Sequence, residues 1–246
     1  MSLIKTDVAR LSHFFRSGPM PCPYLPGRVE RKLFTRLSGV DADDLNSRLS
    51  TAGFRRSHDI VYRPVCHGCT ACVPVRIPAG RFEPNRTQRR LARLNEDLVI
   101  SERPALATLE QYQLFMRYQR GRHGDSDMAR MSRSDFEAMI EEGSVGARLF
   151  EFRDAGRALL GAMLADRLTD GFSAVYSFFD PAEIKRSLGT YMVLGLVDLA
   201  RQEGLDSVYL GYWIEACRKM SYKTSFRPLE ILSGGTWQDL EDDTPD

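Results

Sequence analysis

The stretch FSAVYSFFDPAEIKRSLGTYMVLGLVDLAR, residues 172–201, changes its hydrophobic period halfway along. Its first eight residues are rich in aromatic side chains and predict a buried strand that ends at the turn of Asp180 and Pro181. Beyond that turn the apolar residues recur at helical spacing, at Leu188, Met192, Leu196 and Leu199. Gly204 ends this helix, and residues 207–214, SVYLGYWI, predict a further strand.

Two more strand-like segments precede this stretch, at residues 147–151 and 159–166. The sequences Asp154-Ala155-Gly156 and Asp170-Gly171 separate the segments, and both are typical of hairpin turns. The order strand, strand, strand, helix, strand is that of an acetyltransferase-like (GNAT-like) domain. We therefore predict an α+β protein, in which such a C-terminal domain with a mostly antiparallel sheet follows a small mixed N-terminal domain.

The first hundred residues predict that smaller unit. Pro and Gly are dense across residues 18–27, which exclude regular structure there and indicate an ordered loop or a mobile arm. A helix is expected over residues 41–53 and strands over residues 60–62 and 72–77. We place a cysteine-containing, arginine-rich domain at residues 1–100, the acetyltransferase-like domain at residues 101–238 and an acidic tail at residues 239–246.

Three helices are predicted between the strands of the two domains. The first begins at Asn85 or Thr87, since both residues are good N-caps. Its expected buried stripe consists of Leu91, Leu94 and Leu98. The second helix begins at Thr108 and the third at Ser134, because each is followed three residues later by Gln or Glu, as in a capping box.

Composition limits where the protein can work. The chain has 246 residues and is 43% apolar, yet it contains no apolar run near the roughly 20 residues that span a bilayer. Its N-terminus mixes Lys5, Asp7 and Arg10 with apolar residues, unlike an export signal. Three of its five cysteines lie within residues 66–72, which is unlike the framework of a secreted disulfide protein. We expect a soluble, cytoplasmic protein with no membrane contact.

Charge is unevenly distributed although the net charge is only +1. From Arg76 to Arg93 there are six arginines against one acid, Glu83, whereas the last eight residues hold five acids and no base. A local basic surface of this kind favours a polyanionic partner even when the total charge is near zero.

The cysteines suggest a structural metal site. Cys66, Cys69 and Cys72 follow one another at a spacing of three and could supply three thiolates to zinc or to an iron–sulfur cluster. Either Cys22 or His67 would provide the fourth ligand. The alternative is a tight turn with small, half-buried cysteines.

Residues 186–191, RSLGTY, lie where an acetyltransferase-like domain carries the loop that binds the pyrophosphate of coenzyme A at a helix N-terminus. Such a loop normally has Gly or Ala at the position of the bulky Tyr191. We therefore expect Arg186 and Gly189 to bind the phosphate of some other donor.

Longer segments resemble a known family. The segments CPYLPGRVERKLF (22–34), YRPVCHGCTACVPVRI (62–77) and FEPNRTQRR (82–90) resemble the N-terminal half of the bacterial aspartate/glutamate leucyltransferases. Residues 172–201 and the segment YLGYWIEACRKMSYKTSFRPLE (209–230) resemble the C-terminal half of that family and of the eukaryotic arginyl-tRNA-protein transferases.

The resemblance implies an enzyme that transfers an amino acid from its tRNA to proteins beginning with Asp or Glu, which creates an N-degron for a downstream degradation adaptor. The Cys-x-x-Cys-x-x-Cys segment is of the bacterial type, which favours leucyl-tRNA over arginyl-tRNA as the donor. The eukaryotic enzymes have a Cys-x-x-Cys pair in the early loop and two adjacent cysteines later. Here the residue three positions after Cys22 is Leu25, and Val73 directly follows Cys72. A metal role cannot therefore be transferred from the eukaryotic branch.

Transfer from an activated ester needs no cofactor and no nucleophilic side chain, only an oriented amine, a proton acceptor and a stabilised oxyanion. Asp180 is our candidate for holding the incoming ammonium or relaying its proton, and its alternative role is a turn cap before Pro181. Tyr209 and Tyr212 are candidates for positioning the ester or donating to the oxyanion, and their alternative role is core packing.

Basic residues supply the remaining candidates. Arg86, Arg89, Arg90 and Arg93 on the predicted helix are expected to contact tRNA phosphates, unless they form an ordinary solvated face. A weaker second patch consists of Arg117, Arg120, Arg122 and His123. The 3′ end of the tRNA or the acidic side chain of the acceptor would bind Lys219, Lys223 and Arg227. Arg63 and Arg76 are alternative readers of that acceptor carboxylate.

Two rival functions remain. A coenzyme A-dependent N-acetyltransferase fits the predicted layout, although Tyr191 argues against it. A non-catalytic, zinc-containing RNA-binding module fits the cysteines and arginines, although the long family-like stretch after residue 172 carries no basic excess at its centre.

Overall fold

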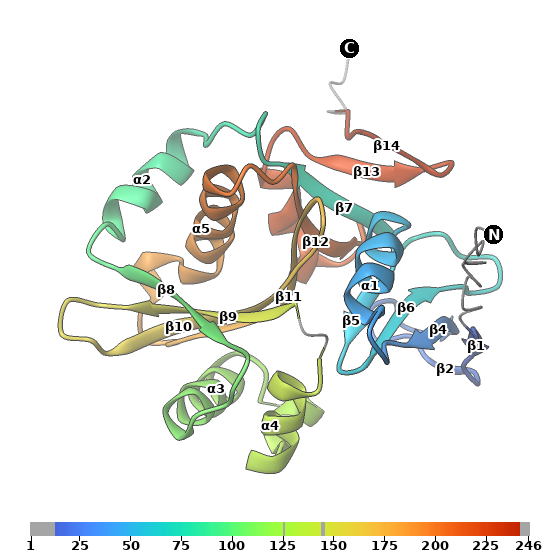
Figure 1. The fold of residues 1–246 in the computed structure, drawn as a ribbon, viewed down its shortest axis with the longest axis horizontal. Coiled ribbons are helices and arrows are strands. Elements are labelled where there is room, and N and C mark those ends of the chain that lie inside the picture. Colours follow the sequence, from blue (N-terminus) through green and yellow to red (C-terminus); the bar gives the residue numbers. More distant parts are fainter. Residues whose placement is uncertain (1–12, 125, 144–145, 242–246) are drawn as a thin grey trace, which may run out of the picture.

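The computed structural model describes residues 13–124, 126–143 and 146–241. An eight-stranded sheet, in the order β14-β13-β7-β12-β11-β10-β9-β8, dominates the structure (Figure 1). A four-stranded sheet, β1-β4-β6-β5, and a two-stranded ribbon, β2-β3, lie beside it. The predicted α+β class with a mostly antiparallel sheet is confirmed.

The large sheet is antiparallel at every pairing except one. Its strands are β7 (Val73–Pro78), β8 (Val99–Pro104), β9 (Ala147–Arg153), β10 (Leu159–Arg167), β11 (Gly171–Phe179), β12 (Ser207–Trp213), β13 (Glu230–Ser233) and β14 (Thr236–Asp239). The exception is β11 and β12, which are parallel and are joined by the helix α5 (Leu188–Gln202). A parallel pair requires such a crossover. The predicted order of three antiparallel strands, a helix and a strand is thus confirmed.

Helices cover both faces of this sheet (Figure 1). The helices α5 and α2 (Arg86–Leu94) lie on one face, and α3 (Leu109–Arg122) and α4 (Arg133–Glu141) lie on the other. Each face therefore has its own core. The core under α5 includes Met192 and Val197, and the core under α3 and α4 includes Phe115, Phe136 and Phe178.

The smaller sheet consists of β1 (Phe15–Arg16), β4 (Lys32–Arg36), β5 (Arg55–Ser57) and β6 (Ile60–Pro64), and α1 (Ala42–Thr51) packs on it. The ribbon consists of β2 (Met20–Pro21) and β3 (Val29–Glu30). Three 3₁₀ turns complete the described chain: η1 (Asp127–Arg130), η2 (Ile184–Arg186) and η3 (Arg218–Ser225). Helix 41–53 and the two strands after it are confirmed, but Met20–Pro21 forms a short strand inside a segment expected to have none.

A buried ion pair joins the two sheets. Arg56 Nε on β5 donates to Asp166 Oδ2 on β10 at 2.6 Å, and the side chains are 1% and 0% exposed. The Asn46 amide on α1 donates to the same oxygen at 3.1 Å. Burial of two charges is favourable only when their geometry and hydrogen bonds compensate for the lost hydration.

Local signals located most helix starts. Asn85, rather than Thr87, caps α2, and Thr108 caps α3, each with a complete capping box. The start at Ser134 is wrong, because the N-cap is Ser132, whose side chain accepts the Asp135 N–H, and α4 begins at Arg133. Leu94 is also wrong as a core residue: it ends the short helix α2 and is 45% exposed.

The division into domains near residue 100 stays a prediction, as does the acidic tail. Strand β7, from the first hundred residues, lies between β13 and β12 inside the large sheet. Of the predicted tail, Asp239 lies in β14 and its carboxylate binds Arg81, whereas residues 242–246 lie outside the described residues. Among the described helices, none has both the length and the apolarity to cross a membrane.

We expect Arg56→Met to lower the free energy of unfolding by about 3–5 kcal/mol, because it leaves the Asp166 carboxylate buried without its partner. The double variant Arg56→Met/Asp166→Leu should recover most of that loss. Urea unfolding measures both. A single variant within about 1 kcal/mol of the parent protein would show that the pair does not join the sheets.

Candidate functional site

The parallel strands β11 and β12 pair only at their beginnings. Gly171, Phe172 and Ser173 pair with residues 207–209, and beyond them the two strands separate. We call the separated parts, residues 174–179 and 210–213, the strand fork. Backbone groups that face the fork have lost their neighbour strand, so other parts of the chain must satisfy them.

Two cationic side chains bind the backbone of the fork. Arg55 Nη2, from β5, donates to the Val175 carbonyl oxygen on β11 at 2.9 Å. Lys223 Nζ, from η3, donates to the carbonyl oxygens of Leu210 at 2.8 Å and Tyr212 at 2.5 Å on β12. Each side of the fork is therefore capped by a positively charged residue type.

Gly211 lets Arg55 approach β12. The β12–β7 register shifts between Tyr209 and Gly211, and Gly211 has a φ of 72°, which favours glycine. A Cβ at this position would lie 3.1 Å from Arg55 Cδ. The irregularity in β12 thus brings Arg55 close to the fork from the smaller sheet.

Lys223 is buried, and the pKa of its ammonium group lies far below the ordinary value. Burial, followed by the positive charge of Arg55, lowers the pKa of the Lys223 ammonium to about 7. A neutral amine has two N–H groups and one lone pair, and the two N–H groups match the two carbonyl oxygens that it contacts. The neutral form is therefore suited to this site at and above neutral pH.

Aromatic and basic side chains from the end of α3 lie next to the fork. The Tyr118 and Phe179 ring centroids are 4.9 Å apart, and the Arg122 guanidinium lies 5.6 Å from the Phe179 ring centroid. Gln119, fully buried, donates to the Tyr176 hydroxyl at 2.7 Å. Burial lowers the pKa of His123, and the charges of Lys219 and Arg122 act in the same direction. Arg122 and His123, two members of the second basic patch predicted from sequence, thus adjoin the fork.

Asp180 directly follows β11. Its Oδ1 accepts the Ala182 N–H at 2.9 Å, as expected for a turn cap, and its Oδ2 lies 3.5 Å from Arg117. The structure therefore gives Asp180 the alternative role considered from sequence, and its part in proton transfer stays a prediction.

Tyr209 belongs to a polar network on β12. Its hydroxyl donates to Asp170 at 2.6 Å and accepts from Arg76 Nη1 at 3.2 Å. Arg76 Nε also pairs with Glu230 at 2.6 Å. Burial, followed by the hydrogen bond to Asp170, raises the pKa of Tyr209. The phenol and the guanidinium are thus engaged with other side chains.

Tyr212 is 2% exposed and lies in the core. Its hydroxyl is 2.9 Å from the Gly53 carbonyl oxygen and 3.0 Å from that of Tyr62. Burial raises its pKa. Its packing position agrees with the alternative role, and catalysis by this residue stays a prediction.

Arg186 and Gly189 form a structural junction at the start of α5. The Arg186 guanidinium binds both Asp97 oxygens, at 2.7 and 2.9 Å, and also pairs with Glu183 at 3.1 Å. A Cβ on Gly189 would lie 3.2 Å from the Phe179 ring. Since Arg186 already has two carboxylate partners, this arrangement disfavours a phosphate at the start of α5.

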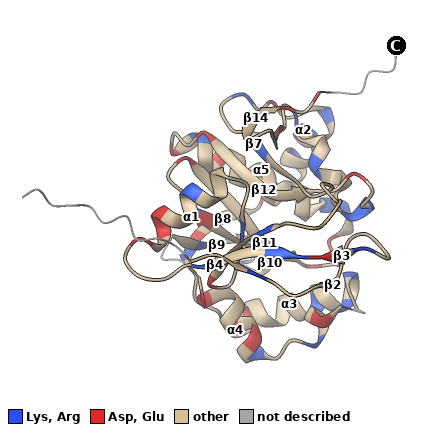
Figure 2. Cartoon of the chain, turned by 90° about the vertical axis from the view of Figure 1, so that its right-hand side faces the viewer, with Lys and Arg blue, Asp and Glu red and all other residues tan. Residues whose placement is uncertain are grey.

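The remaining basic candidates are dispersed. Lys219 and Arg63 are exposed, and Arg227 donates to the Leu240 carbonyl oxygen at 2.6 Å. The α2 arginines at positions 86, 89, 90 and 93 are all exposed. In Figure 2, basic residues mark α2 and a second group near β4, β10 and β11.

The cysteines are near one another but do not form a ligand set. The Leu25 and Arg31 N–H groups donate to the sulfurs of Cys22 and Cys66, at 3.4 and 3.5 Å. Burial, followed by the other three cysteines, raises the pKa of Cys72 to about 12. Within the described part of the chain, no three His, Cys, Asp or Glu side chains are placed to hold a metal. The metal site stays a prediction.

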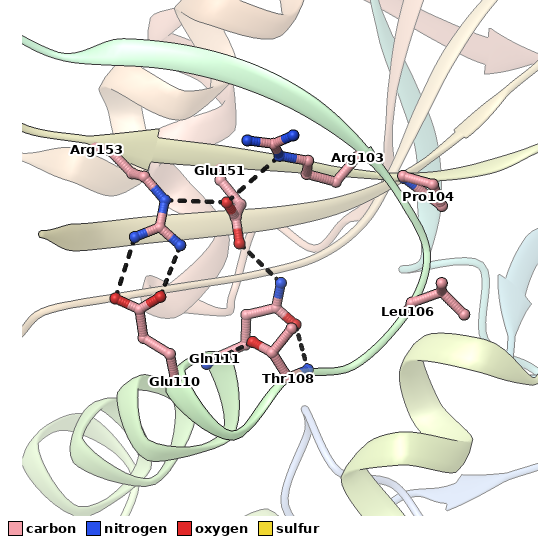
Figure 3. Close-up of a pocket in the computed structure, with 8 residues that line it drawn as sticks. All are labelled: Arg103, Pro104, Leu106, Thr108, Glu110, Gln111, Glu151 and Arg153. Carbon is pink, nitrogen blue, oxygen red and sulfur yellow. Dashed lines mark hydrogen bonds and ion pairs between the residues drawn. The ribbon is translucent and has the colours of Figure 1, made fainter. Parts of the chain in front are cut away.

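A hollow of about 340 Å³ lies elsewhere, between β8 and the start of α3 (Figure 3). The buried Glu151 accepts from Gln111 at 2.8 Å and from Arg153 at 3.0 Å. Arg153 also binds both oxygens of Glu110. These charges satisfy one another, so we assign no chemistry to this hollow.

Sequence reasoning missed Arg55, Gln119 and Tyr176. No local pattern identifies Arg55, because the contact of β5 with β11 joins residues 120 positions apart. Gln119 does carry a signal: it follows Phe115 by four residues and therefore lies on the buried face of α3, where a polar side chain needs a partner.

Comparison with known proteins gives the class first. Residues 20–90 match the family described as "Arginine-tRNA-protein transferase, N terminus", and residues 110–233 match its C terminus. The chain therefore belongs to the arginine-tRNA-protein transferase family.

Individual relatives show to which branch of this family the chain belongs. The chain is 53% identical over 225 residues to "Aspartate/glutamate leucyltransferase" of Paramagnetospirillum magneticum, with 92% of each chain covered. It is 52% identical over 231 residues to the protein of that name in Granulibacter bethesdensis, with 94% of this chain and 86% of the relative covered. The chain is thus a member of the aspartate/glutamate leucyltransferase branch of the family, as the resemblance in the sequence predicted.

Solved structures are more distant. L-PGS from Bacillus licheniformis has a TM-score of 0.45 and 8% identity, over 58% of this chain and 45% of that one. FemX has a TM-score of 0.44 and 13% identity, over 88% of this chain and 65% of that one.

The pKa of Lys223 predicts a pH dependence of stability. Its folded pKa, about 7, lies below the ordinary 10.5, so between these values the unfolded chain binds one more proton than the folded chain. Stability therefore increases with pH in this window, by about 1.4 kcal/mol per pH unit from this group. Lys223→Met should remove that slope.

Urea unfolding at pH 7.5, 8.25 and 9 tests this expectation. The quantity compared is the difference in free energy of unfolding between the parent protein and Lys223→Met, because the contributions of other titrating groups cancel in that difference. The exposed Lys219 on the same segment supplies the control variant, Lys219→Met, whose profile should run parallel to the parent profile. Parallel profiles for Lys223→Met as well would exclude a lowered pKa.

Proposed function

We propose that this chain transfers leucine from leucyl-tRNA to the N-terminal Asp or Glu of acceptor proteins and so creates an N-degron for proteolysis. The observation that carries this proposal is the 53% identity, over 92% of both chains, to a protein named aspartate/glutamate leucyltransferase. We also propose that the reaction takes place in the cytoplasm and that a degradation adaptor recognises the product.

The strand fork supports this reaction chemically. The acceptor α-amine attacks the ester carbonyl carbon of leucyl-tRNA, an amide bond forms, and the ester bond to the ribose breaks. The amine loses its proton and the ribose hydroxyl gains one, so no redox partner takes part. Arg55 makes the fork electropositive, which stabilises both a developing oxyanion and a carboxylate.

The same charge favours the reactive form of the acceptor. A free α-amine has a pKa near 7.7–8.0, and nearby positive charges lower it. An α-ammonium placed beside Arg55 would therefore lose its proton more readily than in water. We propose that the lone pair of neutral Lys223, or water in contact with it, accepts this proton; Asp180 remains the alternative acceptor.

Arginyl-tRNA is the alternative donor, since the matching family is named for arginine. A coenzyme A-dependent N-acetyltransferase is disfavoured because Asp97 and Glu183 occupy Arg186 at the start of α5. The proposed transfer requires no cofactor, and a structural zinc or iron–sulfur group at the four cysteines would not take part in it.

Purified protein, a mixture of charged tRNAs and peptides that begin with Asp, Glu, Arg or Ala test the function. We expect radiolabelled leucine on the Asp and Glu peptides only. Transfer of labelled arginine would show that the donor is arginyl-tRNA. Consumption of acetyl-CoA without transfer from tRNA would contradict the proposal.

The α2 arginines provide a separate test of tRNA contact. Replacing Arg86, Arg89, Arg90 and Arg93 together by Gln should raise the KM for leucyl-tRNA about tenfold or more, with little change in kcat, because phosphate contacts supply affinity without chemistry. The dependence of KM on salt should also become shallower.

The control is Arg130→Gln/Arg133→Gln, which changes exposed arginines of η1 and α4, on the side of the sheet opposite α2 (Figure 1). Its KM for leucyl-tRNA should stay within about twofold of the parent value. An equal rise in KM for both variants would show a general charge effect and exclude α2 as the contact.

A further inference from the structure

Arg55 differs from four other arginines that the fold buries or half-buries. Arg56, Arg76, Arg153 and Arg186 each pair with a carboxylate at 2.6–3.1 Å. For Arg55, no Asp or Glu within the described ranges lies at ion-pair distance, and its one hydrogen bond to the protein goes to the Val175 carbonyl oxygen.

A half-buried guanidinium without a carboxylate is electrostatically expensive, and the neighbours of Arg55 do not neutralise it. Its positive charge acts on Tyr24, Tyr176 and Tyr212, where it opposes the rise in pKa that burial causes. It also lowers the pKa of the buried Lys223 amine. These neighbours are phenols and an amine, and they leave the positive charge of Arg55 unbalanced.

Arg55 also lies at the right place for a ligand. Its guanidinium contacts β11 at the point where the strand separates from β12, and its aliphatic part approaches Gly211 on the other side of the fork. A guanidinium has five N–H donors, of which the Val175 carbonyl oxygen uses one. The others suit the planar, bidentate geometry of a carboxylate.

We infer that Arg55 binds the side-chain carboxylate of the acceptor's N-terminal Asp or Glu and is the residue that selects acidic N-termini. This inference rests on the proposed function and assigns the selection to a residue outside all the candidates from sequence. Bound there, the carboxylate places the adjacent α-amine between Arg55 and Lys223.

The test compares leucine transfer to four otherwise identical peptides that begin with Asp, Asn, Glu or Gln. Loss of the carboxylate charge should lower kcat/KM of the parent enzyme about tenfold or more, because a charged hydrogen-bonded pair is replaced by a neutral one. In Arg55→Gln the Asp and Glu rates should fall further than the Asn and Gln rates, so that the preference approaches 1. Arg55→Lys should retain part of the preference.

The control Arg133→Gln, on α4, should keep the parent preference. If Arg55→Gln lowers all four rates equally and preserves the ratio, Arg55 only supports the fold and the inference is overturned. The same holds if Arg63→Gln, and not Arg55→Gln, removes the preference. A parent enzyme that transfers no leucine to any peptide would instead contradict the proposed function.

A second measurement needs no variant and so does not depend on how Arg55→Gln folds. Phenylglyoxal modifies accessible guanidinium groups, and mass spectrometry locates the modified arginines. The Asp peptide should protect Arg55 in the parent protein at least about threefold better than the Asn peptide, since hydrogen bonds to charged groups are stronger. Equal protection by both peptides would overturn the inference.

Discussion

The buried pair of Arg56 and Asp166 fixes the strand on which the site depends. Because side chains alternate along a strand, Arg56 and Arg55 point to opposite faces of β5. Arg56 is held against Asp166 on β10, and its neighbour is thereby directed to Val175 on β11. A slip of β5 by one residue would exchange the two arginines, placing the unpaired charge in the core. Arg56 is therefore structural, whereas Arg55 has no carboxylate partner among the described residues and can bind a ligand.

The single parallel strand pair of the sheet leaves backbone carbonyl groups without a neighbouring strand, and these side chains bind them. The crossover through α5 brings β12 beside β11, yet the strands share only three residue pairs. Unpaired backbone carbonyls in a buried sheet would be costly, and Arg55 and Lys223 bind three of them. The Arg55 guanidinium can therefore be half-buried here without an acid, since carbonyl dipoles partly replace its hydration.

The sequence was most informative where structure is local. The change of period after Asp180, the capping boxes at Asn85 and Thr108 and the hairpin turns before β10 and β11 depend on residues close together in the chain, and each predicted the element that forms. The error at Ser134 is of the same kind, since Ser132 offers an equivalent cap two residues earlier.

The site depends on contacts that no local pattern contains. Arg55 reaches Val175 across 120 positions, and the sequence around it shows only two adjacent arginines, which are typical of any exposed strand. Conversely, Arg186 had the right neighbours for a phosphate loop, but Asp97 reaches it from 89 positions away and occupies its guanidinium. Charge alone is therefore a poor guide to a site, because Arg56, Arg76, Arg153 and Arg186 pair with carboxylates of the fold.

Electrostatic balance gives the better criterion. In a folded chain, the long-range partners of most buried charges are other charges, so a buried cation that keeps carbonyls and phenols as its only partners marks a place where an anion can bind. The half-buried Arg55 meets this criterion, and the buried amine of Lys223 lies on the other side of the same fork. An acidic N-terminus supplies the missing negative charge and the nucleophilic amine in the same residue, so binding of its carboxylate by Arg55 selects the acceptor and brings the amine to Lys223, the proposed proton acceptor.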